Sequence, residues 1–503
     1  MGSEMCIRDS LESYVTDNLK EELKEDLVQY GSTKGCGTDH CLMHAWEYIL
    51  EAMDDGSSSC NLISIDFSKA FNSLDHAKCL EMFEKRGASK HSVDMLYAFL
   101  ENRKMSVKID NEMSTPLPIN GGSPQGTLLG NIIFIIATSE IDKDIKYGNE
   151  STAALEQSST SPSLHSPNPL TPAPEQLNTS TTSNTSDTSS IRFFRDSRLN
   201  VIRDSDEDSD GNESIDEHAL IREEIIPVHW DPGEPMVVKY VDDVLGAERL
   251  FNLAGKMQLS TDQQTCSIFA KRSEELINAI TVNAANLGLR VNAKKTQMVC
   301  VAGQNTSRIS TFIRDADSGS KVLSGDEMKI LGFHFSSKPT VDLHVEYMIK
   351  KIRKRLWLLR NLKRAKASSS DLTNCYTCFI RPVFDFCSNI YHSMLNKSLS
   401  NQLEKMQNKA LRIIFGYEKS HEELLALSGL PPLQERREIL LESFCKKLYS
   451  NPRFKRQWLG ERIFEGPGLR RQKIVKEKFA RTNRLFNSPL YTIRRKINDI
   501  FVD

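Results

Sequence analysis

Residues 236–245 read MVVKYVDDVL, and this stretch decides the expected fold. Apolar residues flank an aspartate pair on both sides, a pattern typical of two buried strands joined by a tight turn. Asp242 and Asp243 would therefore lie together at the tip of a hairpin. Two neighbouring carboxylates repel each other, and their repulsion destabilises the fold unless a cation neutralises it. The stretch therefore predicts a metal-binding hairpin.

A third carboxylate follows another apolar strand. Residues 62–67 read LISIDF, a short buried strand with Asp66 near its end. Three hard oxygen ligands on adjacent strands suit magnesium, which keeps several waters and shares phosphate oxygens. The pair Asp54 and Asp55 differs, because Gly-Ser-Ser-Ser follows it and indicates a solvated turn.

Length and charge set the frame for this site. The chain has 503 residues, of which 39% are apolar. That is enough for roughly two to four structural units and excludes a wholly disordered chain. The net charge of -2 hides an uneven distribution, because residues 350–503 hold 33 Lys and Arg against 14 Asp and Glu. A basic C-terminal third favours a phosphate backbone as partner, with solvated helix faces as the alternative.

Membrane and disulfide classes are disfavoured. The longest apolar run, residues 128–137, is too short to cross a bilayer, and residues 1–10 read as an artefactual leader, not a secretory signal. Eleven scattered cysteines suit a reduced intracellular compartment and predict no disulfide-linked partner. Four residues that could bind zinc have apolar neighbours, which indicate a buried helix. A zinc site is the less favoured alternative. The four residues are Cys375, Cys378, Cys387 and His392.

A change in composition divides the chain. Residues 149–190 are rich in Ser, Thr and Pro and contain no aromatic residue, and an acidic stretch follows over residues 204–217. Such a segment buries too little apolar surface to offset the entropy of ordering. We expect residues 149–235 to form a disordered insert that loops out from the fold.

Five motifs in order resemble those of reverse transcriptases, most closely those of non-LTR, LINE-like retrotransposons. They are IDFSKAFN at 65–72, GGSPQG at 121–126, YVDD at 240–243, LGLRVNAKKT at 287–296 and ILGF at 330–333. The resemblance implies an RNA-directed DNA polymerase with an α/β (α+β) right-hand fold: a palm with an antiparallel sheet, partial fingers and a helical thumb. The expected parts are partial fingers 11–61, palm 62–148 and 236–340, thumb and helical region 341–450, and a basic tail 451–503.

The resemblance also assigns the chemistry. Asp66 and Asp242 would hold two Mg²⁺ (or Mn²⁺) ions, with Asp243 assisting and the carbonyl of Phe67 as a backbone ligand. The ions would activate the primer 3'-hydroxyl and stabilise charge on the attacked phosphate. Lys295 would protonate the departing pyrophosphate, although Lys294 could take that role and a solvated lysine is the alternative.

Substrate contacts follow from the same resemblance. Phe71 would lie beneath the sugar and exclude a 2'-hydroxyl, with an ordinary core Phe as the alternative. Gln125 and Gly126 would contact the incoming deoxynucleoside triphosphate and the template, and Lys34 is the remaining candidate to hold the triphosphate. Nucleic-acid contacts would come from a primer-gripping turn and from the basic face of the thumb helix, namely Leu331, Gly332, Lys350, Lys351, Arg353, Lys354 and Arg355.

One departure from the family concerns the fingers. In the family they begin well before the QYG-like segment, whereas here fewer than twenty credible residues precede Gln29, which predicts an N-terminally truncated polymerase.

The expected partners are an RNA template and a DNA primer, in the nucleus and cytoplasm. The competing hypothesis is a catalytically inactive remnant that only binds nucleic acid. A metal-dependent nuclease is a more distant third.

Overall fold

The structure is a computed structural model. It describes residues 2–23, 28–54, 59–143, 145, 235–250, 263–302, 312–314, 321–459 and 474–501. These residues belong to one folded unit, while a second unit, residues 160–224, lies outside them. The predicted insert also lies outside the described residues, apart from Pro235.

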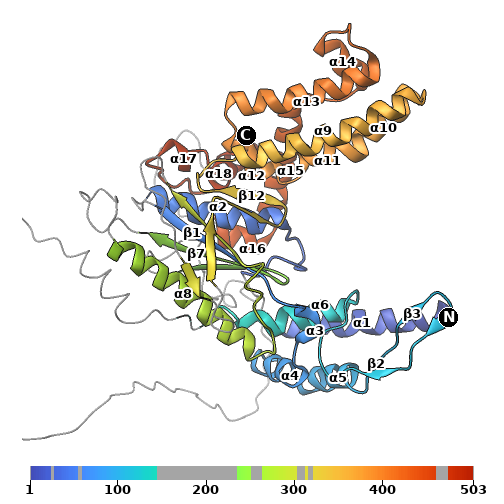
Figure 1. Ribbon diagram of the computed structural model, residues 1–503, viewed down its shortest axis with the longest axis vertical. Coiled ribbons are helices and arrows are strands. Elements are labelled where there is room, and N and C mark those ends of the chain that lie inside the picture. The colour runs from blue at the N-terminus through green and yellow to red at the C-terminus, as the bar shows by residue number, and fades with distance from the viewer. Residues whose placement is uncertain are drawn as a thin grey trace, which may run out of the picture. The chain divides into compact units, whose positions relative to one another are not determined.

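A six-stranded sheet forms the centre of the fold (Figure 1). Its order is β6 (Met236–Tyr240), β7 (Asp243–Leu250), β1 (Ser59–Ile65), β8 (Gln297–Ala302), β10 (Lys321–Gly325) and β9 (Phe312–Arg314). Neighbouring strands run antiparallel except for β8 and β10, which are parallel. The predicted hairpin of two strands around the aspartate pair is confirmed as β6 and β7.

Side chains of the central strands alternate between two hydrophobic cores. Leu62 of β1 joins one core with α2 (Thr38–Asp54), whereas its neighbour Ile63 joins the other with α8 (Gln263–Ala285). Successive residues of a strand point to opposite faces, so a strand that is apolar throughout needs cover on both sides. This explains why LISIDF is nearly continuous in its apolar character.

Short helices lie on the α8 side, and all but the first of them begin at side-chain caps. They are α3 (Ala70–Ser73), α4 (His76–Lys85), α5 (Lys90–Leu100) and α6 (Leu128–Ala137), with α1 (Gly2–Glu22) packed against α5 and α6. Asp75, Ser89 and Thr127 each accept a backbone N–H of the first turn of α4, α5 and α6. Such caps satisfy N–H groups that have no partner within the helix. Helix α1 includes residues 2–10, which the sequence marked as a leader.

A hairpin arm separates α5 from α6. It consists of β2 (Lys104–Met105), β3 (Lys108–Ile109), β4 (Glu112–Met113) and β5 (Leu117–Pro118), with β2 paired to β5 and β3 to β4. Asp110 adopts a positive φ of 53° at its turn, a conformation that Asn and Asp tolerate better than most residues.

The C-terminal half is helical after one short hairpin. β11 (Glu327–Ile330) and β12 (Phe333–Ser336) precede a series of helices. These are α9 (Asp342–Arg364), α10 (Ser369–Cys375), α11 (Arg381–Asp385), α12 (Ser388–Tyr391), α13 (Lys397–Phe415), α14 (His421–Ser428), α15 (Leu433–Ser450), α16 (Pro452–Phe454), α17 (Asn483–Phe486) and α18 (Pro489–Phe501). Helices α9 and α13 lie alongside each other (Figure 1).

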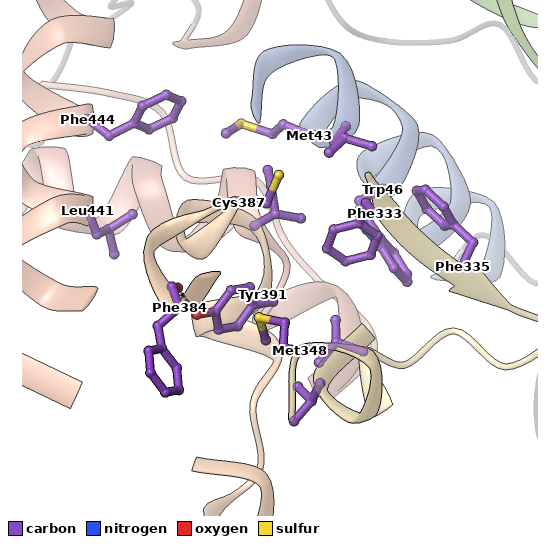
Figure 2. Close-up of a cluster of buried hydrophobic side chains, with 14 of the residues drawn as sticks. Met43, Trp46, Phe333, Phe335, Met348, Phe384, Cys387, Tyr391, Leu441 and Phe444 are labelled. Carbon is purple, nitrogen blue, oxygen red and sulfur yellow. Dashed lines mark hydrogen bonds between the residues drawn. The ribbon is translucent and has the colours of Figure 1, made fainter. Parts of the chain in front are cut away.

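Aromatic packing joins this half to α2. Figure 2 shows Trp46 of α2 beside Phe333 and Phe335 of β12, with ring centroids 6.0 and 5.1 Å away. Met348 of α9 and Tyr391 of α12 belong to the same core. Helices α17 and α18, which lie within the predicted basic tail, also pack against α2. Within the described part of the chain, no helix is long and apolar enough to cross a membrane.

Candidate active site

The three predicted carboxylates lie at one end of the central sheet. Asp66 directly follows β1, Asp242 lies in the turn between β6 and β7, and Asp243 begins β7. In the antiparallel pair of β1 and β7, Ile65 is opposite Val244. One step further along this ladder brings residue 66 level with residue 243. Pairing between strands therefore gathers carboxylates that are far apart in the sequence.

The carboxylates at this end carry more negative charge than their surroundings neutralise. Partial loss of water, together with Asp242 and Asp66, raises the pKa of Asp243 to about 6, although part of this residue is exposed. Oδ2 of Asp66 accepts no hydrogen bond among the described residues, and the ammonium of Lys295 lies 3.5 Å from it as an ion-pair partner. Unsatisfied carboxylate oxygen close to like charges is the environment that a divalent cation stabilises. The donor chemistry therefore fits Mg²⁺ or Mn²⁺, although no three acidic, His or Cys side chains among the described residues form a ready-made metal cluster.

Lys295 lies beside this end of the sheet. Its Nζ is 3.5 Å from Oδ2 of Asp66, and the lysine side chain is 68% exposed. The backbone fixes this approach, because the N–H of Asn292 donates to the carbonyl of Asp66 and the N–H of Lys295 donates to the carbonyl of Asn292. The structure thus brings Lys295 and Asp66 together.

The two predicted Phe positions have different surroundings. Phe67 is buried and forms a β-bridge with Val291, which keeps the backbone of Phe67 next to the loop that carries Lys295. Phe71 is half-buried in α3, and its ring stacks on that of Phe134 with centroids 4.4 Å apart. The carbonyl of Phe71 accepts the N–H of Ser123 at 2.5 Å.

This last contact ties the GGSPQG loop to α3. Gly122 has a φ of +86°, and a Cβ there would lie 2.8 Å from the carbonyl oxygen of Phe71, so only glycine fits. Gln125 and Gly126 follow on the exposed part of the loop, just before α6. Lys34 is also exposed. It lines a pocket together with residues of α1 and α6, and the GGSPQG loop does not line this pocket.

A second pocket lies below the turn between β11 and β12. Leu331 and Gly332 form this turn with positive φ angles of 47° and 84°. Gly332 lines the pocket together with Lys351 and Arg355 of α9. The predicted primer-gripping turn and part of the predicted thumb surface therefore meet.

The basic residues of α9 divide into two kinds. Lys350, Lys351, Arg353 and Lys354 are exposed. Arg355 is half-buried, donates to the carbonyl of Phe379 and lies over its ring at 4.4 Å. Its guanidinium is therefore engaged within the protein and differs from the four exposed cations. Sequence reasoning assigned all five the same role and missed this packing.

The cysteine cluster has a mixed environment. Cys387 is buried, whereas Cys378 is exposed. Burial lowers the pKa of His392 to about 4, and its Nδ1 lies 3.2 Å from Nε of Arg437. The cluster thus belongs partly to the helical core, and no metal-binding group includes it among the described residues.

Comparison with known proteins gives an independent indication. Residues 8–155 match the family described as "Reverse transcriptase (RNA-dependent DNA polymerase)". Two Drosophila melanogaster relatives are the probable RNA-directed DNA polymerases from transposon BS and from transposon X-element. They are 28% and 27% identical to this chain over 113 residues, which is 22% of this chain and 12% of each relative. The match therefore spans about an eighth of the relatives' length.

Solved structures of telomerase are more distant. The Candida albicans telomerase bound to a fragment of telomeric RNA is 11% identical, and 84% of this chain covers 58% of that chain. The Candida tropicalis apo telomerase is 10% identical, with 89% and 59% covered. Both TM-scores are 0.33. The antiparallel sheet and helical C-terminal half agree with the right-hand polymerase fold expected from the sequence.

Proposed function

The chain is similar to the reverse transcriptases of non-LTR, LINE-like retrotransposons, and from this we propose that it is an RNA-directed DNA polymerase. The observation that carries the proposal is the group formed by Asp66, Asp242 and Asp243 at one end of the sheet. Its charge is only partly neutralised, because Oδ2 of Asp66 accepts no hydrogen bond among the described residues and the ammonium of Lys295 beside it is largely exposed. Such a group suits divalent cations that also share phosphate oxygens.

Asp66 and Asp242 would hold the two ions, with Asp243 and the carbonyl of Phe67 as further ligands. Bound Mg²⁺ or Mn²⁺ would supply activation of the primer hydroxyl and neutralisation of the phosphate charge. Lys295 is exposed and within reach of Asp66, so its ammonium can donate a proton to pyrophosphate. Without substrate, the same ammonium partly neutralises Asp66.

The GGSPQG loop, between β5 and α6, would receive the nucleotide beside Phe71, whose carbonyl it contacts. The stacking of Phe71 on Phe134 holds that ring in one orientation, which a steric test for a 2'-hydroxyl requires. Gln125 and Gly126 are exposed on this loop and would contact the incoming nucleotide and the template. Lys34 would attract the triphosphate, although the GGSPQG loop does not line the pocket that Lys34 lines.

The template and primer would lie along α9. Leu331 and Gly332 would hold the primer backbone, and the exposed Lys350, Lys351, Arg353 and Lys354 would contact phosphates. Arg355 would support this surface through Phe379. The partners are an RNA template, a DNA primer and deoxynucleoside triphosphates, and the sites of action would be the nucleus and cytoplasm. An inactive remnant that only binds nucleic acid is less favoured, because all three carboxylates are present.

Primer extension on an RNA template tests the proposal. We expect extension with Mg²⁺ or Mn²⁺ and none with a chelator, and a loss of at least about 10³-fold in the Asp242→Asn variant. Asp94→Asn is the matched control, because Asp94 is an exposed carboxylate on α5. Unchanged extension by Asp242→Asn would refute the assignment.

A further inference from the structure

The QYG segment, Gln29 to Gly31, lies along the free edge of β6, the strand that leads into the aspartate turn. The N–H of Lys239 donates to the carbonyl of Val28, and the N–H of Tyr30 donates to the carbonyl of Lys239, both at 2.9 Å. β6 is the outermost strand of its side of the sheet. The segment therefore extends the sheet by a short parallel bridge.

The side chain of Gln29 reaches the turn itself. It is 1% exposed, and its Oε1 accepts the N–H of Gly31 at 3.0 Å and the N–H of Val241 at 3.1 Å. Both partners are donors, which fixes the amide with its oxygen toward the turn. Val241 directly precedes Asp242, so this hydrogen bond holds the backbone that carries the aspartate pair.

The turn needs such support because its first residue is strained. Val241 has a φ of +59°, a region that β-branched residues avoid and that tight hairpins usually fill with glycine. A residue in this region persists only where the surrounding structure holds it there. Close packing adds to the hydrogen bond, because a Cβ on Gly31 would lie 2.5 Å from both the backbone nitrogen and Cγ2 of Val241.

Gln29 is itself held from the far end of the chain. Arg453, at 5% exposure, donates from its guanidinium to the carbonyl of Gln29 at 3.1 Å and lies 5.5 Å from the ring of Tyr30. The hydroxyl of Tyr30 and Nδ1 of His44 are 2.7 Å apart. A buried polar chain thus runs from α16 through Gln29 to Val241.

We propose that Gln29 is a positioning residue for Asp242 and Asp243, and that Arg453 anchors it. The inference rests on the proposed function, because it assumes that the aspartate pair holds catalytic metal. Gln29 touches no reacting atom. It keeps the strained turn in the one conformation that directs both carboxylates toward the end of β1, and Arg453 makes this conformation depend on the helical C-terminal region.

Two variants separate the hydrogen bond from mere packing. Gln29→Met keeps the length of the side chain but removes the acceptor, whereas Gln29→Glu keeps an acceptor oxygen at the same reach. We expect Gln29→Met to lower kcat for RNA-templated extension by about 10- to 100-fold, with a smaller change in KM for the nucleotide. Gln29→Glu should recover most of this loss. Gln434→Met, an exposed Gln on α15, is the control.

A readout besides activity is Mn²⁺ binding, followed by electron paramagnetic resonance on the full chain without nucleic acid. Gln29→Met should bind Mn²⁺ about tenfold more weakly than the wild type. Adding Val241→Gly to Gln29→Met should restore both Mn²⁺ affinity and kcat, because glycine adopts the positive φ without strain. If Gln29→Met fails to fold, Arg453→Lys gives the same test in weaker form.

The proposal is overturned if folded Gln29→Met keeps kcat and Mn²⁺ affinity within about threefold of the wild type, or if Val241→Gly gives no recovery. These outcomes differ from failure of the proposed function. A wild-type chain that binds Mn²⁺ but extends no primer would refute the polymerase assignment, while the comparison of Mn²⁺ affinities would still decide the role of Gln29.

Discussion

Two groups of carboxylates in this protein have opposite surroundings. Helix α2 presents Glu47, Glu51 and Asp54 to the C-terminal helices, and each has donors close by. Oε1 of Glu47 accepts from the hydroxyl of Ser488 and the N–H of Leu490, both at 2.7 Å. The second group, Asp66, Asp242 and Asp243, lies at the end of the sheet with the cation of Lys295 beside it.

The other two carboxylates of α2 are supplied with donors in the same way. Asp54, which the sequence predicted to lie in a solvated turn, is instead buried at the end of α2. It accepts the N–H groups of Arg481 and Thr482 at 3.0 and 2.6 Å, directly before α17. Glu51 lies 3.3 Å from Lys478. The N–H of Leu490 that Glu47 accepts belongs to the first turn of α18, where free N–H groups and a partial positive charge stabilise a carboxylate. The α2 carboxylates thus receive backbone and side-chain donors from the C-terminal region, although Oε2 of Glu47 accepts no hydrogen bond among the described residues. The carboxylates that we propose as metal ligands have the ammonium of Lys295 beside them instead. The comparison teaches that the kind of donor, and not residue type, distinguishes the two groups.

The largest expected effect comes from exchanging one carboxylate at the end of the sheet. Asp66→Asn should lower primer extension by at least about 10³-fold while leaving the free energy of unfolding unchanged or higher, because it removes repulsion toward Asp243. Extension assays and urea unfolding on the same preparation measure both. A stability loss as large as that of a core mutation would place Asp66 among the structural carboxylates.

A second test uses the pH dependence of stability. Burial, with Glu51 nearby, raises the pKa of Glu47 to about 7 from 4.5. Between these values the folded state keeps a proton that the unfolded state has lost, so stability falls as pH rises from about 4.5 to 7. The Glu47 contribution to this fall is at most roughly 3 kcal/mol.

The Glu47→Gln variant should therefore lose less stability than the wild type between pH 5 and 7.5. Urea unfolding at several pH values measures the difference, and Asp94→Asn serves as the exposed control. Parallel curves for Glu47→Gln and the wild type would show that burial does not perturb this carboxyl as described.

The next effect concerns the start of α17. Asp54→Ala removes the acceptor for two backbone N–H groups and should destabilise the protein by about 1 to 2 kcal/mol. Primer extension per folded molecule should stay within about threefold of the wild type, since Asp54 is not one of the proposed metal ligands. Chemical denaturation and an active-site titration give the two values. Loss of activity without loss of stability would break the distinction between the groups.

The smallest effect concerns the cations of α9. Changing Lys350, Arg353 and Lys354 to Gln should make the slope of log duplex affinity against log salt concentration shallower by about two to three. Each phosphate contact contributes roughly 0.9 to this slope. Arg355→Gln alone should change this slope by less, since its guanidinium is engaged with Phe379. Fluorescence anisotropy of the full chain at several salt concentrations measures both. Slopes equal to that of the wild type in all variants would show that these cations of α9 are only solvated and contact no phosphate.

The sequence could predict the hairpin of β6 and β7, because apolar runs around Asp242 and Asp243 follow local strand and turn chemistry. It could not predict that Arg453 holds Gln29, since these residues are 424 positions apart and pair only in the folded chain. The engagement of Arg355 by Phe379 was missed for the same reason, because charge pattern does not show which cations find partners.

Mn²⁺ binding measured by electron paramagnetic resonance, with primer, template and a non-extendable nucleotide present, tests the central claim most directly. The account predicts that wild type and Asp54→Asn bind Mn²⁺ alike, whereas the double variant Asp66→Asn, Asp242→Asn binds it at least about tenfold more weakly. Equal Mn²⁺ affinity in the double variant, or a loss confined to Asp54→Asn, would contradict the claim that the carboxylates at the end of the sheet are the metal ligands.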